Sequence, residues 1–348
     1  MAKMRAAVCP EPGRIIMDEV ERPEPGPGEV LVRVCATGLC GSDLDGYHGK
    51  HPMIGYPAIM GHECSGTVAA VGPGVSGFTE GDAVVVEPFF VCGVCPACLK
   101  GQYNLCVDLL IIGHQIPGSL AEYVKAQARF LHPKPACVPF DEAAIAEPLA
   151  GSLHAVKRAG VSIGDFVVVI GCGTIGSLAL QHVLNAGAEA LVAEVKPSRA
   201  DLARRLGATH TFLRPVAGGP ESLKSRVLEL TGGVGADVVI EAVGKPETLA
   251  ETVGLARRGG TIMLIGWSGN PSDAMDMTSV TLNELAVLGT LGFCWDHKTA
   301  LRLLETGKVD IASLITHRVG IEDTERGLQM MASGDDQVGK IIVWSSPA

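Results

Sequence analysis

The sequence lacks a cluster of basic residues and lacks a long apolar run. Its 28 Lys and Arg stand against 38 Asp and Glu, which gives a formal net charge of −10. A chain with this balance is a poor partner for nucleic-acid phosphates or for an anionic membrane surface. The most apolar stretch, residues 166–180, is too short and too rich in glycine to span a bilayer. We therefore expect no nucleic acid and no membrane among its partners.

The sequence also lacks the marks of a small secreted protein. No charged and then apolar leader precedes the first strand-like segment, and the eleven cysteines are an odd number. Both features argue against a disulfide framework, so we expect a cytoplasmic protein whose cysteines bind metal or remain free. A length of 348 residues, 47% of them hydrophobic, suits two domains with substantial cores, at about 150 residues per domain.

Four cysteines lie within fifteen residues, spaced C-x2-C-x2-C-x7-C: Cys92, Cys95, Cys98 and Cys106. This spacing lets four thiolates converge on one ion, which is the closed geometry of a structural zinc site. The fourth spacing fits an iron–sulfur cluster poorly. A zinc ribbon that binds nucleic acid needs nearby cations, and only Lys100 is close. Clustered free thiols are the remaining alternative.

A second possible metal site is spread more widely along the chain. Cys40 is followed by His62 and Glu63, and much later by Glu147. A thiolate, an imidazole and one or two carboxylates form a mixed donor set, and mixed sets with an open position are typical of catalytic zinc. Spacing alone leaves the alternative that Cys40 and His62 are each core residues.

The second half of the chain has the pattern of a nucleotide-binding fold. The continuous apolar run 166–170 predicts a strand buried on both faces of a parallel sheet. It leads into Gly171, Gly173, Thr174, Ile175 and Gly176, and a helix-like stretch follows at 177–186. Glycines at this spacing, after a strand and before a helix, allow close approach of a pyrophosphate to a helix N-terminus.

A carboxylate follows directly after the next predicted strand, 190–193. Glu194 can accept hydrogen bonds from both ribose hydroxyls of NAD and would repel the 2′-phosphate of NADP. Lys196 and Arg199 follow closely and keep NADP open as an alternative. Strands at 236–240 and 261–265, with a helix at 246–256 between them, continue the pattern of an α/β, doubly wound parallel sheet.

These motifs together resemble the zinc-containing medium-chain alcohol dehydrogenases, in particular the sorbitol (polyol) and threonine dehydrogenase branch. The resemblance covers essentially the whole chain. Its motifs are GLCGSD around Cys40, GHE at 61–63, the four-cysteine segment, EPLA at 147–150, GCGTIG at 171–176, Glu194 with Arg199, and the ending from 314 to 342.

The resemblance implies a fold of two domains. Residues 1–150 would form a GroES-like, mostly β catalytic domain, with a structural zinc lobe at about 88–110. Residues 151–289 would form a Rossmann domain that binds NAD, and residues 290–348 would return to the catalytic domain. The active site would lie in the cleft between the domains, and the family suggests a homodimer or homotetramer.

The resemblance also assigns roles to residues. Cys40, His62 and Glu63 match the catalytic zinc ligands, whereas Glu147 lies beside the metal and can join it or exchange with water. The four clustered cysteines match the structural zinc ligands. The matching cofactor contacts are Ile175, Glu194, Arg199, and the backbones around Ile265, Gly266 and Leu291 to Phe293.

Departures from the family pattern concern the proton path and the substrate. Ser42 matches the hydroxyl that passes on the substrate proton, but Asp45 stands where many relatives have the histidine that ends this relay. The alternatives for the end of the relay are Asp45, His48, or water together with Glu147. Gly292 stands where sorbitol dehydrogenases carry an arginine before an aromatic residue, and this loss makes sorbitol itself a doubtful substrate.

We therefore expect a zinc-dependent oxidoreductase that transfers a hydride from a small secondary alcohol to NAD. The alcohol would be a polyol, a sugar or a sugar-acid derivative. One alternative is oxidation of an amino alcohol, as in threonine 3-dehydrogenases. A non-catalytic dinucleotide-binding protein is the other alternative, and the presence of Cys40 and His62 counts against it.

Overall fold

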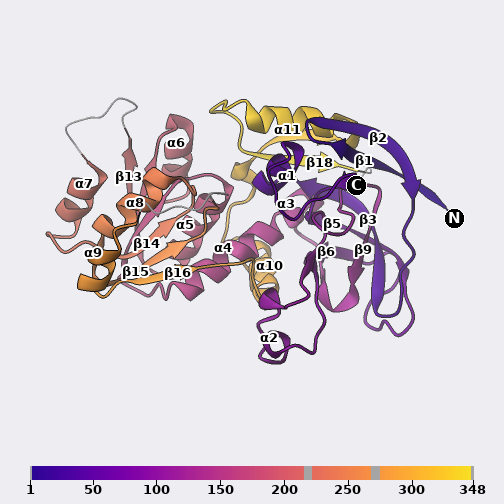
Figure 1. Cartoon of the computed structure of the whole chain (residues 1–348), viewed down its shortest axis with the longest axis horizontal. Coiled ribbons are helices and arrows are strands. Elements are labelled where there is room, and N and C mark those ends of the chain that lie inside the picture. The colour runs from indigo at the N-terminus through magenta and orange to yellow at the C-terminus, as the bar shows by residue number, and fades with distance from the viewer. Residues whose placement is uncertain (1, 215–221, 268–274, 346–348) are drawn as a thin grey trace. The chain divides into compact units, whose positions relative to one another are not determined.

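A computed structural model describes residues 2–214, 222–267 and 275–345 of the chain. The chain divides into two compact units (Figure 1). The first comprises Met1–Glu147, His297–Gly307 and Ile311–Ala348, and the second comprises Pro148–Asp296 and Lys308–Asp310. Within the described residues, every helix is too short or too polar to cross a membrane.

The first unit is built mainly from strands. Its N-terminal part contains β1 (Lys3–Glu11), β2 (Arg14–Glu21), β3 (Glu29–Gly38), α1 (Gly41–Tyr47), β4 (Ala58–Ile59), β5 (Glu63–Val71), β6 (Ala83–Val86), β7 (Phe89–Phe90), α2 (Pro96–Leu99), η1 (Tyr103–Leu105), β8 (Leu110–Ile111), β9 (Tyr123–Gln127), η2 (Ala128–Phe130), β10 (Leu131–Pro133) and α3 (Phe140–Ala144). Its C-terminal part contains α10 (His297–Glu305), η3 (Ala312–Leu314), β17 (Ile315–Gly320), η4 (Ile321–Asp323), α11 (Thr324–Ala332) and β18 (Lys340–Trp344).

The largest sheet of this unit joins strands from both ends of the chain. Its order is β10-β6-β5-β3-β18-β17, and β9 also pairs with β3. Strand β18 runs antiparallel to β3, with Ile342 opposite Gly38. Valines at alternate positions of β3, namely Val30, Val32 and Val34, are fully buried in its core. The last strand therefore lies beside the segment that leads to Cys40.

The second unit alternates strands and helices. Its elements are α4 (Ala146–Arg158), which begins in the first unit, then β11 (Phe166–Ile170), α5 (Thr174–Asn185), β12 (Glu189–Glu194), α6 (Pro197–Arg205), β13 (His210–Leu213), α7 (Leu223–Leu230), β14 (Ala236–Glu241), α8 (Pro246–Leu255), β15 (Ala256–Leu264), α9 (Met277–Leu282) and β16 (Ala286–Gly289). All the strands run parallel in the order β13-β12-β11-β14-β15-β16.

Both faces of this sheet are covered, as the apolar run in β11 predicts. Val167 and Val169 pack into a core with residues of α4 and α5, such as Ala155 and Leu180. Their neighbours in β11 point the other way, into a core with residues of α7 and α8. This alternation follows from the two-residue period of a strand. The prediction of a doubly wound parallel sheet is confirmed, although α5 begins at Thr174, inside the glycine motif, rather than at 177.

Candidate active site and metal centres

The four clustered cysteines converge on one point. Their sulfur atoms all lie within 4.8 Å of one another, and the Sγ of Cys106 is 3.5 Å from that of Cys92 and 3.9 Å from that of Cys95. A tetrahedron with zinc–sulfur bonds of about 2.3 Å has edges of about 3.8 Å, so these separations fit zinc. Backbone N–H groups of Cys98 and Val107 lower the pKa of the Cys95 thiol to about 6, which favours a thiolate. This set is the structural zinc site.

Two contacts fasten the segment that carries this zinc site to the rest of its unit. The hydroxyl of Tyr103 donates to Glu87 Oε1 at 2.5 Å, and Arg129 Nη2 donates to the carbonyl of Val91 at 2.7 Å. Tyr103 also packs with Phe89 and Phe130 in a cluster of aromatic rings. The segment therefore has both polar and apolar attachments to the rest of the first unit.

Neighbouring strands bring the second donor set together. Glu63 begins β5 and pairs with Gly38 at the end of β3, two residues before Cys40. Donor atoms of Cys40, His62 and Glu63 lie within 4.8 Å of one another. A side chain at position 38 would collide with the Glu63 carboxylate, so the glycine makes room for it. One thiolate, one imidazole and one carboxylate suit a zinc ion with a free coordination position, and this is the Cys/His/Glu zinc site.

Glu63 has a buried partner that we did not predict. Lys340 Nζ lies 2.7 Å from Glu63 Oε1 and 2.6 Å from Oε2, and it also donates to the carbonyl of Leu39 at 2.8 Å. Lys340 is 4% exposed and Glu63 is 1% exposed. Burial acts to lower the pKa of Lys340, but the charges of Glu63 and Cys40 outweigh it and raise the pKa. The lysine therefore keeps its positive charge beside the metal ligands.

Asp43 is a second residue that supports the ligands and was not predicted. It is fully buried, and its carboxylate accepts hydrogen bonds from the N–H groups of Cys40 and Gly61, each at 2.9 Å. Its Oδ1 lies 3.7 Å from His62 Nδ1. Burial acts to lower the pKa of His62, whereas Asp43 and Cys40 raise it well above its usual value. An acidic residue three positions after Cys40, at the first turn of a helix, was the available signal.

Glu147, the second residue of α4, lies in the same electrostatic environment. Burial raises the pKa of its carboxyl group to about 7, and the charges of His62, Glu63 and Lys340 all act on it. The group of donor atoms close enough to share a metal contains Cys40, His62 and Glu63 but not Glu147. A carboxyl group with this pKa can hold or release a proton near neutral pH.

The predicted proton-relay residues lie on α1 and directly after it. The Oγ of Ser42 is buried and makes no hydrogen bond within the described part of the chain. Asp45 is partly buried. Burial lowers the pKa of His51, and the charge of Asp45 acts against this shift. His48 is exposed, and its ring lies beside that of Tyr47, with the centroids 5.5 Å apart.

Two further histidines lie close to His62. The ring of His114 is 5.1 Å from that of His62, and the ring of His51 is 4.5 Å from that of His114. Burial lowers the pKa of His114 to about 3, and the charges of His62 and His51 act in the same direction. His51 was not among the residues predicted to lie here. A histidine eleven positions after Cys40 gives no spacing signal.

The glycine motif has the predicted geometry in the second unit. Gly171 has φ +88° directly after β11, and Gly173 precedes the first residue of α5, Thr174. Ile175 follows in the first turn of α5. A side chain at Gly176 would collide with the carbonyl of Gly171, so this glycine permits close packing of helix and strand.

Glu194, at the end of β12, is 5% exposed and holds the glycine turn in place. Its Oε2 accepts from the N–H of Cys172 at 2.8 Å, and its Oε1 accepts from those of Val195 and Lys196 at 2.7 and 3.0 Å. Arg199 also reaches this turn, since its Nη1 lies 3.7 Å from the position of a Cβ added at Gly173. The carboxylate and the guanidinium thus both lie beside the predicted dinucleotide site.

The other predicted cofactor contacts lie at two further strand ends of the same unit. The N–H groups of Ile265 and Gly266, just after β15, donate to the carbonyl of Glu241 at 2.9 and 3.0 Å. Leu291 is half exposed, whereas the side chain of Phe293 is fully buried, so only the backbone of Phe293 could meet a dinucleotide.

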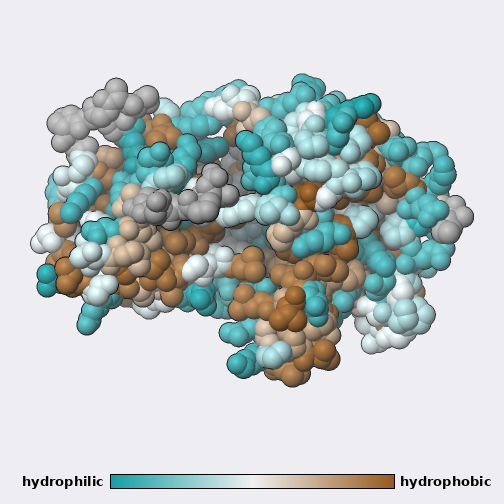
Figure 2. Space-filling model, viewed as in Figure 1, coloured by the Kyte–Doolittle hydropathy of each residue, from teal (hydrophilic) through white to brown (hydrophobic). Residues whose placement is uncertain are grey.

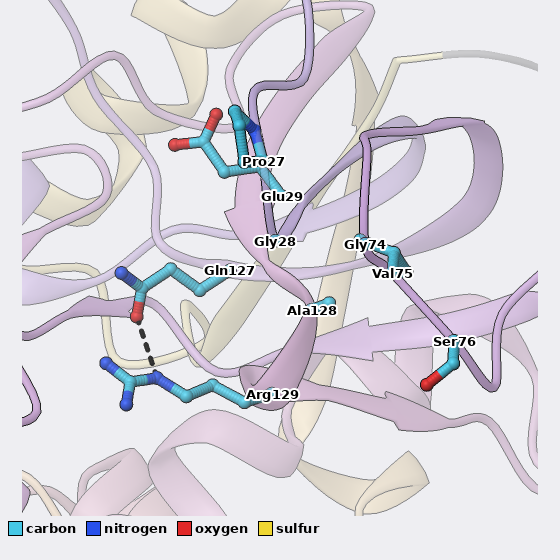
Figure 3. A pocket seen from close by; sticks show the side chains of 9 residues that line it. All are labelled: Pro27, Gly28, Glu29, Gly74, Val75, Ser76, Gln127, Ala128 and Arg129. Atoms are coloured by element: carbon cyan, nitrogen blue, oxygen red, sulfur yellow. Dashed lines mark hydrogen bonds between the residues drawn. The ribbon is translucent and has the colours of Figure 1, made fainter.

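A separate pocket of about 500 Å³ lies in the first unit, between the turns around Gly28 and Gly74 and the end of β9 (Figure 3). There Arg129 Nε donates to Gln127 Oε1 at 3.0 Å. The residues that line the pocket include neither the zinc ligands nor the predicted relay residues.

Sequence comparisons match both units. Residues 26–136 match the alcohol dehydrogenase GroES-like domain family, and residues 174–306 match the zinc-binding dehydrogenase family. The sorbitol dehydrogenase of Bacillus subtilis strain 168 is 30% identical over 346 residues, which cover 98% of this chain and 97% of that protein. The L-threonine 3-dehydrogenase of Pyrococcus abyssi is 35% identical over 333 residues, 93% of each chain.

Solved structures resemble the whole chain. A zinc-binding dehydrogenase from Sinorhizobium meliloti 1021 bound to NADP has a TM-score of 0.88 and 32% identity, and covers 99% of this chain and 100% of its own. An Escherichia coli CFT073 alcohol dehydrogenase complexed with NADH has a TM-score of 0.91 and 26% identity, with the same coverage. Together with the two metal sites, these matches show that the chain belongs to the zinc-containing medium-chain alcohol dehydrogenase family and is an NAD(P)-dependent alcohol or polyol dehydrogenase.

Proposed function

We propose that the protein oxidises a small secondary alcohol, namely a polyol, a sugar or a sugar-acid derivative, and transfers the hydride to NAD. The observation that carries this proposal is the convergence of Cys40, His62 and Glu63 within 4.8 Å, a donor set that leaves a coordination position for a substrate oxygen. We also propose that residues 1–150 and 290–348 form the catalytic domain and residues 151–289 the domain that binds NAD.

The protein's own groups would hold the metal and set its charge. A zinc ion in this position supplies Lewis acidity, which lowers the pKa of an alcohol oxygen. Cys40, His62 and Glu63 would bind the ion, and Asp43 would orient the segments that carry Cys40 and His62 through its bonds to two backbone N–H groups. Lys340 competes for the Glu63 carboxylate, so it would limit how much negative charge Glu63 gives to the metal.

The proton released from the alcohol needs a path to solvent. Ser42 Oγ is buried without a hydrogen bond in the described part of the chain, and we propose that it accepts this proton and passes it on. Asp45 and Glu147 are the candidates for the next step. Glu147 has a pKa of about 7, and Asp45 acts on His51, a buried histidine that could receive the proton. His48 is less favoured because it is exposed and its ring lies against Tyr47.

Preference for NAD follows from Glu194. Its buried carboxylate beside the glycine turn would accept hydrogen bonds from ribose hydroxyls and repel a 2′-phosphate. Arg199 lies near the same turn and could offset part of this repulsion, so we propose a preference for NAD rather than strict selection.

We further propose a homodimer or homotetramer that works in the cytoplasm. The structural zinc segment bears exposed apolar side chains, which belong to Val94, Leu99, Leu105, Val107 and Leu110. They form an apolar patch around α2 (Figure 2), and such patches commonly mark contacts between proteins. The edge strand β16 could add a second contact by pairing with its copy. A reducing compartment would keep the eleven thiols reduced.

The test is a substrate panel on the purified, zinc-loaded protein. NADH formation is followed at 340 nm with polyols, aldonates, inositols and amino alcohols, and NADP replaces NAD as a comparison. We expect activity with a hydroxyl-rich secondary alcohol, weak activity with sorbitol, and loss of activity in Cys40→Ala without loss of the structural zinc. Activity only with amino alcohols would favour the threonine dehydrogenase alternative. Undiminished activity in Cys40→Ala would exclude the proposed zinc chemistry.

A further inference from the structure

A tight turn in the first unit holds His114 against the segment that carries the zinc ligand His62. Gly113 has φ +81°, and a Cβ atom there would lie 2.4 Å from the carbonyl oxygen of Gly61, so the two backbones are in direct contact. The same carbonyl accepts from the N–H of Ser119 at 2.9 Å. The ring of His114 thus meets that of His62 at 66°, with the centroids 5.1 Å apart.

Both ring nitrogens of His114 are buried and have no hydrogen-bond partner within the described part of the chain. Buried polar groups of a folded protein are almost always hydrogen-bonded. The neighbouring groups are satisfied, because the N–H of His114 donates to the carbonyl of Ile111 at 3.1 Å and Gln115 Oε1 accepts from the N–H of Ile111 at 3.0 Å. The two unpaired nitrogens of the ring therefore point to a ligand.

This ligand is not one of the two zinc ions. Among the described residues, the groups of donor atoms close enough to share a metal do not include His114. The ring of His51, which is 6% exposed, packs against that of His114 with the centroids 4.5 Å apart and limits its movement. His114 is thus a fixed polar group beside a zinc ligand, available to a molecule bound at the Cys/His/Glu zinc site.

A hydroxyl group of the substrate suits this imidazole. A hydroxyl can donate to a bare ring nitrogen or accept from a ring N–H, so it can bond whichever nitrogen faces it. On a polyol, further hydroxyls lie on the carbons next to the one that is oxidised. A substrate whose reacting oxygen is bound beside His62 therefore carries a second hydroxyl within reach of the neighbouring ring of His114.

The charges around the site favour a neutral partner over a carboxylate. The carboxylates of Asp43 and Glu63 both act electrostatically on Glu147, so three acidic groups lie close together. A zinc ion and Lys340 would offset these charges together with that of the Cys40 thiolate, but they leave no excess of positive charge to attract a substrate carboxylate.

We propose that His114 is a specificity-determining residue that hydrogen-bonds a second hydroxyl of the substrate, on the carbon next to the one that is oxidised. This inference rests on the proposed oxidation of a secondary alcohol at the Cys/His/Glu zinc site. It narrows the substrate class to polyols and sugars with neutral hydroxyl groups on neighbouring carbons. A substrate with a carboxylate directly beside the reacting carbon falls outside this class.

Two alcohols that differ by one hydroxyl test this role. Steady-state oxidation of 2,3-butanediol and of 2-butanol by the zinc-loaded protein with NAD gives kcat/KM for each. We expect the wild type to prefer the diol by at least about tenfold, because the alcohol without the second hydroxyl leaves a buried polar group unpaired. His114→Leu removes both nitrogens, so it should bring the ratio close to one and change kcat/KM for 2-butanol by less than about threefold.

Two further variants interpret the result. His114→Gln keeps a donor and an acceptor and should retain part of the preference for the diol. His210→Leu, on β13 of the second unit, is the control and should keep the wild-type ratio. A wild-type ratio in His114→Leu would overturn the proposal. An equal loss of activity on both alcohols would also overturn it, since that result indicates a role in proton transfer or in folding.

A binding measurement separates this inference from the proposed activity. Protein saturated with NADH can bind an alcohol but cannot oxidise it, so calorimetric titration with each alcohol gives a Kd without turnover. Tighter binding of the diol that disappears in His114→Leu would support the inference even if neither alcohol is oxidised, a result that would count against the proposed oxidation alone. Equal affinities of the wild type for the two alcohols would overturn the inference even if both are oxidised.

Discussion

Lys340 and Glu63, 277 positions apart in the chain, form a buried ion pair with Nζ 2.7 Å from Oε1 and 2.6 Å from Oε2. The pair exists because β18 inserts beside β3, with Ile342 opposite Gly38, while β5 flanks β3 on its other side with Glu63 opposite the same glycine. A metal ligand is thus tied to the last strand of the chain.

Lys340→Met should destabilise the zinc-free protein far more than the zinc-loaded protein. The change leaves the buried Glu63 carboxylate without its cation, and breaking a buried pair costs about 3–5 kcal/mol of unfolding free energy. Zinc would neutralise the same carboxylate and offset part of this cost. Urea unfolding with and without zinc measures both values. Lys298→Met, on the exposed side of α10, is the control, and an equal effect of the two variants would contradict the expectation.

Asp43→Asn should weaken zinc binding at the Cys40 site by about 10- to 100-fold, the usual effect of losing a group that orients metal ligands. An amide nitrogen would face a backbone N–H that now donates to the carboxylate. A competition titration with a chromogenic chelator measures the affinity of the more weakly bound zinc ion. Asp18→Asn, exposed in β2, is the control. An unchanged affinity in Asp43→Asn would show that these hydrogen bonds do not support the metal.

Ser42→Ala should lower kcat by about 10²-fold, in the range for a lost proton-transfer group, with little change in the KM for NAD. Asp45→Asn should have a smaller effect that is greatest at high pH, where His51 is neutral, because loss of the Asp45 charge makes His51 a weaker base. His48→Gln is the exposed control and should behave like the wild type. A larger loss of kcat in His48→Gln than in Asp45→Asn would reverse the order of the relay candidates.

Glu194→Ser should reduce kcat/KM for NAD by about 10- to 100-fold, since hydrogen bonds to a charged group contribute about 1.5–3 kcal/mol. The same change should reduce kcat/KM for NADP less, or raise it, because the repulsion of the 2′-phosphate disappears. Steady-state kinetics with both cofactors gives the ratio. Glu189→Ser, exposed at the start of the same strand, controls for loss of charge. A constant ratio in Glu194→Ser would mean that another residue sets the preference.

Local pattern was enough to predict much of the fold. The apolar run of β11 and the glycines after it specify a buried strand, a turn and a helix within about twenty residues, and all three are present. The cysteine spacing likewise determines the structural zinc site, because its four ligands lie close in sequence. In both cases the interactions that shape the site are local.

Residues that depend on distant pairing were not predictable in this way. Lys340 reaches Glu63 only through the placement of β18 beside β3, and a lysine near the end of a chain otherwise indicates an exposed charge. His51 and His114 approach His62 through loops whose path the sequence pattern does not specify.

His182 should make the stability of the second unit depend on acid pH. It is 3% exposed, and its Nε2 donates to the carbonyl of Leu149 at 3.1 Å. Burial lowers its pKa to about 4, against 6.5 for an unperturbed histidine. Between pH 4 and pH 6.5 the unfolded chain binds a proton at this histidine, whereas the folded protein does not. The stability contribution is therefore complete above pH 6.5 and is lost as the pH falls toward 4, by up to about 3 kcal/mol.

His182→Gln removes this titration and keeps a side-chain N–H that can reach Leu149. The variant should be less stable than the wild type near neutral pH, because its shorter side chain fills the site less well, and the gap should narrow as the pH falls from 6.5 toward 4. Urea unfolding across this range gives the difference at each pH, and subtraction cancels any zinc loss that the two proteins share. His210→Gln, on the edge strand β13, is the control, and its unfolding free energy should change with pH in the same way as that of the wild type. A difference in unfolding free energy between His182→Gln and the wild type that stays constant with pH would show that burial does not lower the pKa of His182.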